Sequence, residues 1–331
     1  MNKSILITGG AGYIGSHITE KIIKKNKNIV ILDNFSTGYK YLVNRNAKFI
    51  KGDIKNLNLL KKIIKNYQIN TIIHLAAYLN INESEKYKRK YYENNVIGTL
   101  NLIKSCKNSN VKYFIYSSSC SVYGNAKGAV TEKTKINPQS YYAFTKYKGE
   151  QLLKKNEKKY KYKYAILRYF NVAGASNSGK IGEIQKSHDH IVKNISIQAL
   201  SSKPNIKIYG NNYKTKDGTC VRDYIHISDL VDIHIKILRL LKYKKSKSII
   251  VNCGYGIGYS VLDIVKISQK FIKELRYNFI NKRKGDVAEI YAKADYLIKI
   301  LKWKPKKKII EDIIKSSIRW EKKIKKIIKI V

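Results

Sequence analysis

A glycine-rich turn near the amino terminus limits the possible folds of this chain more than any other feature. The segment TGGAGYIG occupies residues 8–15, between an apolar run at residues 3–8 and helical apolar spacing in residues 16–25. Gly9 permits a tight turn, Gly12 lets the backbone approach a diphosphate, and Gly15 lets a helix pack on a sheet. The first N–H groups of that helix then point at an anion. A strand, this turn and a helix predict a dinucleotide-binding unit.

An acidic residue favours this interpretation over a purely structural turn. Asp33 ends the apolar run at residues 28–33, about 20 residues after the glycines, where a carboxylate binds adenosine ribose hydroxyls. Such a carboxylate would repel the 2′-phosphate of NADP, so the predicted cofactor is NAD. Asp53 and Ile54 follow a third apolar run at residues 48–51 and could flank the adenine. A helix cap is the alternative role for Asp53.

Apolar runs and helical patterns alternate through the first half of the chain. Further buried strands are predicted at residues 71–76, 111–117 and 162–168, and helices at residues 56–67, 91–107 and 140–155. Continuous apolar strands that alternate with helices are typical of a parallel sheet covered on both faces. The predicted fold class is α/β, with a Rossmann-type doubly wound parallel sheet and a smaller α/β substrate-binding domain.

The alternation loosens after about residue 171, where glycine-rich and polar segments interrupt short elements. We therefore expect a cofactor domain at residues 1–175 and a substrate domain at residues 176–331. Residues 228–241 have the pattern of a sheet-covering helix, so a stretch of about residues 222–245 is expected to return to the first domain. The Lys/Ile tract at residues 309–331 predicts a packed helix with a solvated lysine face, rather than a membrane or nucleic-acid contact.

Ser119, Tyr142 and Lys146 are the predicted catalytic residues. Ser119 ends a serine cluster at the carboxyl end of the fifth strand, and ligands bind at that edge of a parallel sheet. Tyr142 and Lys146 are four residues apart on the next helix and share a face. A nearby ammonium and an oxidised nicotinamide favour the phenolate, so Tyr142 is expected to act as a base with Ser119 guiding the proton. Each feature alone arises by chance in a chain with 27 Tyr, so the prediction depends on their joint placement.

These motifs resemble a known family. The turn at residues 8–15, SSSCSVYG at 117–124 and YxxxK at 142–146 are similar to the extended short-chain dehydrogenase/reductase superfamily. Within it, LRYFNVAGA at 167–175 and IYGNNYKTKDGTCVRDYIHISDL at 208–230 resemble the UDP-glucose 4-epimerase family. Shorter matches are LDN at 32–34, GDI at 52–54, ENNVIGTL at 93–100, KRKGD at 282–286 and LKWKP at 301–305. The resemblance covers nearly the whole chain.

The resemblance implies that UDP-galactose and UDP-glucose are interconverted through oxidation at sugar C4, with tightly bound NAD taking and returning a hydride. Tyr142 is then the base on the 4-hydroxyl, Ser119 assists, and Lys146 holds the nicotinamide ribose and lowers the Tyr142 pKa. The 4-keto sugar turns its other face before the hydride returns. The implied cofactor site comprises Gly9, Gly12, Tyr13, Ile14, Gly15, Asp33, Asn34, Asp53, Ile54, Asn95, Tyr142 and Lys146.

The resemblance also implies a UDP-sugar site, mainly in the second domain. Arg222 and Arg283 would pair with the diphosphate, because the planar guanidinium fork matches phosphate oxygens. A surface ion pair with Asp223 is the alternative for Arg222. Tyr209 would pack near the uracil, and Asp286 would bind the uridine ribose. The implied substrate-binding set is Ser119, Tyr142, Asn171, His190, Ile191, Tyr209, Arg222, Arg283 and Asp286, and no metal is expected.

Some positions depart from the family pattern. Leu79 stands where some members have a Lys near the cofactor phosphates. Residues 183–193 match the nucleotide-binding stretch poorly, and His190 is a better aligned candidate than His188. Ile290 lies where a bulky aromatic restricts the sugar pocket in some members, so the smaller side chain would admit an N-acetyl group.

Other nucleotide-sugar enzymes are the nearest alternatives. A 4-epimerase for UDP-N-acetylglucosamine or UDP-glucuronate would use the same residues. A nucleotide-sugar 4,6-dehydratase is disfavoured, because its elimination of water needs a carboxylate pair beside the serine. Ser119 is followed by Cys120-Ser121-Val122-Tyr123, with no carboxylate.

The net charge of +44 is the main feature in favour of a nucleic-acid-binding protein with a Rossmann-like fold. The basic residues are spread along the chain, however, and no basic block is interleaved with stacking aromatics. Lys, Ile, Asn and Tyr share AT-rich codons, so mutational bias explains their joint excess. We expect no specific nucleic-acid partner.

Location and assembly follow from simpler features. No run approaches the roughly 20 apolar residues of a membrane span, and residues 1–15 lack the core of a secretory signal. We therefore expect a cytoplasmic protein without a membrane partner. Four Cys without close pairing predict buried thiols rather than disulfides or a zinc site. The resemblance implies a homodimer.

Overall fold

The structure is a computed structural model that describes residues 3–25, 28–184, 190–283, 286–306 and 309–328. These residues form two units. Unit 1 comprises Met1–Gly124, Pro138–Arg168 and Val231–Val251. Unit 2 comprises Asn125–Asn137, Tyr169–Leu230 and Asn252–Val331. The chain thus enters each unit three times, whereas the sequence predicted one change near residue 175 and one return at about residues 222–245.

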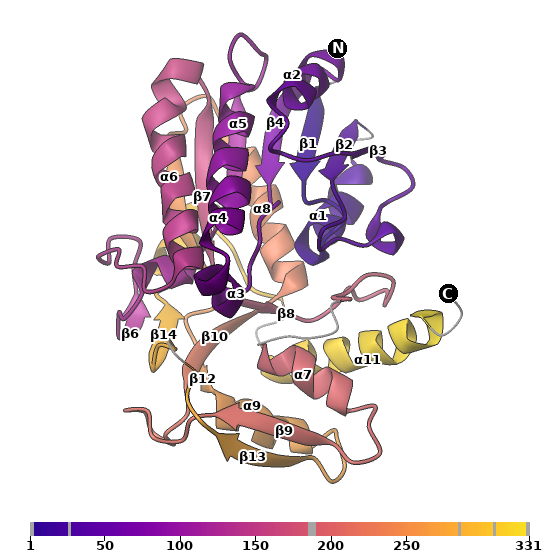
Figure 1. Ribbon diagram of the computed structural model, residues 1–331, viewed down its shortest axis with the longest axis vertical. Helices are drawn as coiled ribbons and strands as arrows, with labels where there is room; N and C mark the ends of the chain where they lie inside the picture. Colours follow the sequence, from indigo (N-terminus) through magenta and orange to yellow (C-terminus); the bar gives the residue numbers. More distant parts are fainter. Residues whose placement is uncertain (1–2, 26–27, 185–189, 284–285, 307–308, 329–331) are drawn as a thin grey trace. The chain divides into compact units, whose positions relative to one another are not determined.

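A seven-stranded sheet forms the centre of unit 1 (Figure 1). Its strands are β1 (Ser4–Thr8), β2 (Ile29–Asp33), β3 (Lys48–Lys51), β4 (Ile69–His74), β5 (Tyr113–Ser119), β7 (Lys163–Tyr169) and β11 (Ile249–Cys253). The spatial order is β3-β2-β1-β4-β5-β7-β11, and the strands from β3 to β5 run parallel. The order reverses between β1 and β4, as in doubly wound dinucleotide-binding folds. The predicted Rossmann-type sheet is confirmed.

Helices cover both faces of this sheet (Figure 1). They are α1 (Tyr13–Ile23), α2 (Leu57–Asn66), α3 (Ile81–Lys86), α4 (Lys88–Tyr91), α5 (Gly98–Lys104), α6 (Tyr141–Tyr160) and α8 (Ile227–Lys242), with 3₁₀ turns η1 (Lys40–Leu42) and η3 (Cys120–Tyr123). On one face, α2, α5 and α6 share an apolar cluster with the strands. No helix in the described part of the chain is long and apolar enough to cross a membrane.

The prediction of one continuous helix over residues 91–107 is wrong in the middle of that range. The structure has α4, then a π-helical segment η2 (Tyr92–Ile97), then α5. Asn94 and Asn95 are consecutive and both buried in the π-helical turn. They hydrogen-bond each other, from Asn94 Nδ2 to Asn95 Oδ1 at 2.9 Å. The spacing of apolar residues in the sequence does not reveal this turn, because the buried Asn94 and Asn95 are polar.

Unit 2 contains two smaller sheets. Its strands are β6 (Gly128–Val130), β8 (Asn171–Ala173), β9 (Asn205–Tyr209), β10 (Val221–His226), β12 (Gly258–Ser260), β13 (Arg276–Ile280) and β14 (Glu289–Ala292). One sheet has the order β12-β10-β14-β6, with β8 also paired to β10, and β13 pairs with β9 in the other. The predicted smaller α/β domain is thus observed as a mixed assembly of short strands and helices.

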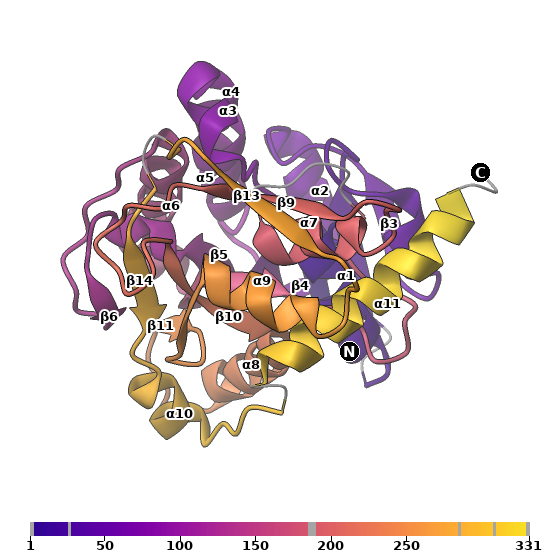
Figure 2. The ribbon, with the colours of Figure 1, turned by 90° about the horizontal axis from the view of Figure 1, so that it is seen from below.

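The helices of unit 2 are α7 (Ile191–Gln198), α9 (Val261–Gln269), α10 (Asp295–Leu301) and α11 (Ile310–Ile328). Figure 2 shows α7 and α11 side by side, and residues of the two helices are in contact. The inner face of α11 carries Ile313, Ile314 and Trp320, all buried, while Lys322 and Lys323 face solvent. The packed terminal helix predicted from the Lys/Ile tract is confirmed.

A buried ion pair joins α6 to β7 in unit 1. Arg168 and Glu150 are only 2% and 0% exposed, and Arg168 Nη2 lies 2.7 Å from Glu150 Oε2. Arg168 Nε donates to Glu150 Oε1 at 2.9 Å, and Nη1 donates to Tyr123 Oη at 2.9 Å. Ser118 Oγ donates to the same carboxylate at 2.6 Å. Since both charges are hydrogen-bonded on several sides, the desolvation cost of burying them is offset.

Arg168→Met should lower the free energy of unfolding by about 3–5 kcal/mol, because it leaves the Glu150 carboxylate buried without its cation. Urea denaturation followed by circular dichroism measures this. Arg89→Met is the control, since the Arg89–Glu93 pair lies on the exposed surface and contributes little. Equal midpoints for the two variants would contradict the prediction.

Candidate functional site

The glycine turn closes tightly after β1. Gly9 has φ of +74°, and its N–H donates to Leu32 O at 2.9 Å. A Cβ atom at Gly9 would lie 2.7 Å from the backbone nitrogen of Ala76, and one at Gly15 would lie 2.3 Å from the Gly9 carbonyl oxygen. No side chain fits at either position, so this backbone turn, called the glycine cradle below, requires glycine at both. Helix α1 begins at Tyr13, directly after Gly12, and points its amino terminus at this cradle.

The predicted ribose-binding carboxylate lies beside the cradle. Asp33 is the last residue of β2, and its Oδ2 accepts a hydrogen bond from Ala11 N at 3.0 Å. Its Oδ1 accepts from Phe35 N at 2.8 Å. Burial raises the pKa of Asp33, and the two backbone hydrogen bonds partly offset this. A backbone cradle, a helix amino terminus and a carboxylate after the second strand fit a dinucleotide.

Asn34 and Asp53, both cofactor candidates, lie together. Asn34 Nδ2 donates to Asp53 Oδ2 at 3.1 Å, and Lys55 N donates to Asp53 Oδ1 at 2.7 Å. The side chain of Asn56, not Asp53, caps α2. The helix-cap alternative for Asp53 is therefore wrong. Ile54 is buried next to it.

Asn95 connects the segment after β4 to α6. Its Oδ1 accepts from Tyr78 N at 2.9 Å, and its Nδ2 donates to Tyr78 O and to Thr145 Oγ1, each at 3.1 Å. These bonds hold the edge of the sheet at which the glycine turn lies. The cofactor contact of Asn95 stays a prediction.

Ser119, Tyr142 and Lys146 come together in unit 1, as predicted. Ser119 is the last residue of β5, and its Oγ accepts hydrogen bonds from Ser121 N at 3.2 Å and Ser121 Oγ at 2.9 Å. The Ser119 hydroxyl also acts to lower the pKa of the Tyr142 phenol. Lys146 Nζ donates to Ser117 O at 2.6 Å, and its ammonium lies 5.2 Å from the centre of the Tyr116 ring. Tyr142 and Lys146 occupy successive turns at the start of α6. The arrangement places a phenol, a hydroxyl and an ammonium along one strand end.

Burial dominates the electrostatics of these residues. It raises the pKa of Tyr142, against the smaller lowering by the Ser119 hydrogen bond. It also lowers the pKa of Lys146 to about 7, although the Glu150 carboxylate favours the charged form. For Tyr142 the loss of hydration on burial is the largest effect on the pKa. The expectation that Lys146 lowers the pKa of Tyr142 in the NAD-bound enzyme stays a prediction.

Three predicted substrate residues form a cluster in unit 2. Tyr209 ends β9, and the Arg283 guanidinium lies 4.5 Å from the centre of its ring. Arg283 Nε donates to Asp286 Oδ2 at 3.0 Å. An aromatic face, a guanidinium and a carboxylate thus lie next to each other. Such a set can stack on a base, pair with a phosphate and accept from ribose hydroxyls.

Arg222 and Asp223 have separate partners. Arg222 Nη1 donates to Val221 O at 2.8 Å. The buried Asp223 carboxylate accepts from the backbone N–H groups of Tyr255, Gly256 and Ala292, at 2.9, 2.8 and 3.2 Å. The alternative role for Arg222, a surface ion pair with Asp223, is wrong, because the Asp223 carboxylate accepts hydrogen bonds from backbone N–H groups instead.

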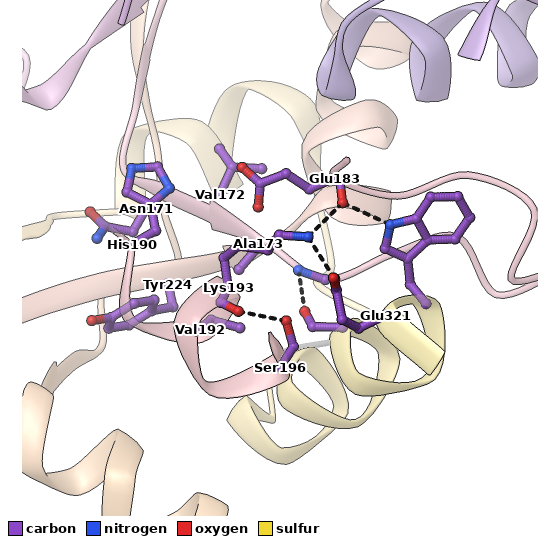
Figure 3. A pocket seen from close by; sticks show the side chains of 13 residues that line it. Asn171, Val172, Ala173, Glu183, His190, Val192, Lys193, Ser196, Tyr224 and Glu321 are labelled. Carbon is purple, nitrogen blue, oxygen red and sulfur yellow. Dashed lines mark hydrogen bonds and ion pairs between the residues drawn. The ribbon is translucent and has the colours of Figure 1, made fainter. Parts of the chain in front are cut away.

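A pocket in unit 2 brings together two predicted substrate residues, Asn171 and His190, with Tyr224 (Figure 3). Glu183 and Lys193 also line it. Burial raises the pKa of Glu183 to about 7, with Lys193 acting in the opposite direction. Residues 185–189, which include His188, lie outside the described residues.

Sequence reasoning did not select Tyr224. It lies two residues after Arg222 on β10 and pairs in register with Asn171 on β8. The alternation of side chains along a strand puts residues 222 and 224 on the same side, a signal that was present in the sequence. Ile191 is the first residue of α7, and Ile290 is buried in β14 opposite Arg222.

Known proteins are similar to this chain over nearly its full length. The sequence matches the NAD dependent epimerase/dehydratase family over residues 5–254. A UDP-glucose 4-epimerase of Lactobacillus helveticus is 39% identical over 320 residues, 96% of this chain and 97% of that protein.

Two solved structures have the same fold. The UDP-glucose 4-epimerase from Bifidobacterium longum, in complex with NAD+ and UDP, is 32% identical with a TM-score of 0.90, covering 97% of this chain and 98% of that one. The UDP-Glc/GlcNAc 4-epimerase from Campylobacter jejuni is 33% identical with a TM-score of 0.81, covering 97% and 99%. The similarity thus includes both units of the chain.

Lys146→Met should stabilise the nucleotide-free protein, because it removes a buried ammonium. The pKa of Lys146 is about 7 in the fold against an ordinary value of 10.5, so between these pH values the unfolded chain binds more protons. The stability of the unchanged protein therefore rises with pH across this window, and the advantage of the variant shrinks. Melting temperatures at pH 6 and pH 10 measure the effect.

Lys154→Met is the matched control, since Lys154 is exposed on the same helix. Its melting temperature should follow that of the unchanged protein at both pH values. A Lys146→Met variant that is less stable at pH 6 would refute the argument from burial.

Proposed function

The chain belongs to the NAD dependent epimerase/dehydratase family, and we propose that it interconverts UDP-galactose and UDP-glucose by inverting sugar C4 with NAD as cofactor. One structural observation carries the mechanism: Ser119, Tyr142 and Lys146 meet at the carboxyl end of the sheet that also bears the glycine cradle. The identity of 39% to a UDP-glucose 4-epimerase, over 96% of this chain, supports the substrate.

The cofactor would be held by backbone and by one carboxylate. The cradle from Gly9 to Gly15 and the amino terminus of α1 would bind the diphosphate, and Asp33 would bind the adenosine ribose. Asn34 and Asp53, joined by a hydrogen bond, would lie near the adenine. When bound, NAD supplies reversible hydride transfer, which allows C4 to become a ketone and to be reduced from the opposite face.

The residues of unit 1 would remove the proton of the sugar 4-hydroxyl and return one. Tyr142 Oη removes the proton of the 4-hydroxyl and later returns one, and Ser119 hydrogen-bonds the same oxygen. Burial holds Tyr142 protonated, so the phenolate requires positive charge close by. Lys146 provides one such charge while it binds a ribose of the cofactor, and the oxidised nicotinamide provides another.

The residues of unit 2 hold the nucleotide. The cluster of Tyr209, Arg283 and Asp286 supports a uridine diphosphate site, with the ring near the uracil and the guanidinium on a phosphate. Arg222 adds a second guanidinium, and Asn171 and His190 would contact the sugar diphosphate or the nucleotide. Anchoring at the nucleotide leaves the sugar able to turn, as inversion requires.

Assembly and location complete the proposal. We infer a cytoplasmic homodimer that forms through helices on one face of the cofactor unit. Exposed aromatic side chains on that unit, including Tyr87 and Tyr92 beside α4, support a partner surface there.

Purified protein should convert UDP-galactose to UDP-glucose without added NAD. Tyr142→Phe should lower kcat at least about 100-fold, because it removes the acid/base group. Tyr147→Phe, on the same helix, is the control and should keep kcat. Coupled detection of UDP-glucose measures both, and the NAD content of each variant shows that the cofactor is retained. An unchanged kcat in Tyr142→Phe would exclude this mechanism.

N-acetylated sugars form a second candidate substrate class. Ile290 is buried in β14, where the sequence predicts extra room beside the sugar, and the similar Campylobacter jejuni protein is a UDP-Glc/GlcNAc 4-epimerase. We expect turnover of UDP-N-acetylgalactosamine as well as UDP-galactose, with Ile290→Tyr reducing the former more. Chromatography of the two products measures the ratio. An enzyme that turns over UDP-galactose alone would rule this class out.

A further inference from the structure

Lys193 is an unusual residue at the start of α7. It is the third residue of the helix and its side chain is 4% exposed. The first turn of a helix carries partial positive charge, so a lysine there is electrostatically unfavourable. Burying its ammonium costs more still unless a partner is present. Its position therefore depends on what it contacts.

The ammonium of Lys193 has two partners that lie outside α7. Nζ lies 2.6 Å from Glu321 Oε2, on α11, and donates to the carbonyl oxygen of Glu183 at 2.8 Å (Figure 3). Glu321 is itself only 15% exposed. A charge-assisted bond in such surroundings is strong and directional. It ties the first turn of α7 to α11.

The neighbouring residue on α11 reinforces this contact. Trp320 Nε1 donates to the same Glu183 carbonyl oxygen at 2.8 Å. A Cβ atom at Gly182 would lie 2.4 Å from the Trp320 ring, so the indole packs directly on the backbone there. Residues 182–183 and the first turn of α7 are thus held by one face of α11.

The same face of α11 holds the strand that bears Asn171. Gly174 N donates to Ser317 Oγ at 3.1 Å, and Ala175 N donates to Ser316 Oγ at 3.2 Å. These residues follow β8 directly. Positions 316 and 320 are four residues apart, as are 317 and 321, so these four side chains share one side of the helix. One helix face therefore supports both segments that supply Asn171 and His190.

We propose that α11 is the positioning element of the UDP-sugar site in unit 2, and that the Lys193–Glu321 ion pair fixes the backbone of His190 and Ile191 for binding the nucleotide. The inference rests on the proposed function, because it assigns a role within that site. Lys193 and Glu321 are positioning residues: each acts through the first turn of α7 and not on the sugar. The pair should affect binding of the nucleotide in the ground state and in the transition state alike.

Lys193→Met tests the proposal in the NAD-bound enzyme. We expect KM for UDP-galactose and Kd for UDP to rise about tenfold, with kcat within about twofold of the unchanged enzyme. Steady-state kinetics and calorimetric titration with UDP measure these values. Glu321→Gln keeps the shape of the side chain. It should raise KM and Kd by a smaller factor than Lys193→Met, again with kcat nearly unchanged. It also serves if Lys193→Met fails to fold.

Two further variants separate positioning from general stability. Lys322→Met changes an exposed lysine on the same helix and should leave KM unchanged. Lys193→Arg retains a cation opposite Glu321 and should recover most of the lost affinity. The Lys193→Met/Glu321→Gln double variant should bind UDP no worse than Lys193→Met, since the two changes break one interaction.

The outcomes are distinguishable from failure of the proposed function. If the unchanged enzyme neither binds UDP nor epimerises UDP-galactose, the proposed function is wrong. If it does both, and Lys193→Met has the KM of Lys322→Met or loses only melting temperature or kcat, the pair is structural and the inference is overturned.

Discussion

The site of unit 1 depends on the buried ion pair between Glu150 and Arg168. The pair fixes α6 against the central sheet, and it does so one turn beyond Lys146 and two turns beyond Tyr142. Two consecutive serines of β5 contact these turns: Ser117 O accepts from the Lys146 ammonium, and Ser118 Oγ donates to the Glu150 carboxylate. Because the Glu150 contact is anchored by a buried charge pair, it fixes the position of Lys146 one turn away. In the proposed mechanism, the catalytic geometry would then depend on the electrostatics of the core.

Two buried lysines show how the partner of a cation determines what it can do. Lys146 donates to the carbonyl and hydroxyl oxygens of Ser117, and burial lowers its pKa to about 7. Lys193 meets the carboxylate of Glu321 directly. The first ammonium is therefore poised to respond to charge on a bound ligand, while the second is committed to a contact within the fold. In the proposed function, the same residue type would serve chemistry in unit 1 and support in unit 2.

The features that could be predicted from the sequence are those formed by residues close together along the chain. Continuous apolar runs and the glycine turn specify the parallel sheet and its cofactor edge, because strand, turn and helix succeed each other within 33 residues. Tyr142 and Lys146 are four residues apart, so their common helix could be predicted for the same reason, and their catalytic role stays a proposal. The π-helical turn at Asn95 could not be predicted, because polar side chains fill it. The partner of Lys193 lies 128 residues away, and no periodicity reports such a pair.

The excess of positive charge can be understood from where the acidic residues lie. Of 23 acidic residues, several are engaged inside: Asp223 holds three backbone N–H groups, and Asp229 accepts from Tyr255 Oη and Lys306 N. These carboxylates stabilise the fold locally and do little to neutralise the surface. Surface lysines repel each other only weakly, since water and salt screen charges beyond about 10 Å at 0.1 M. The same screening limits long-range attraction of anionic ligands, so in the proposed function recognition of a diphosphate would depend on placed groups such as Arg283 on Tyr209.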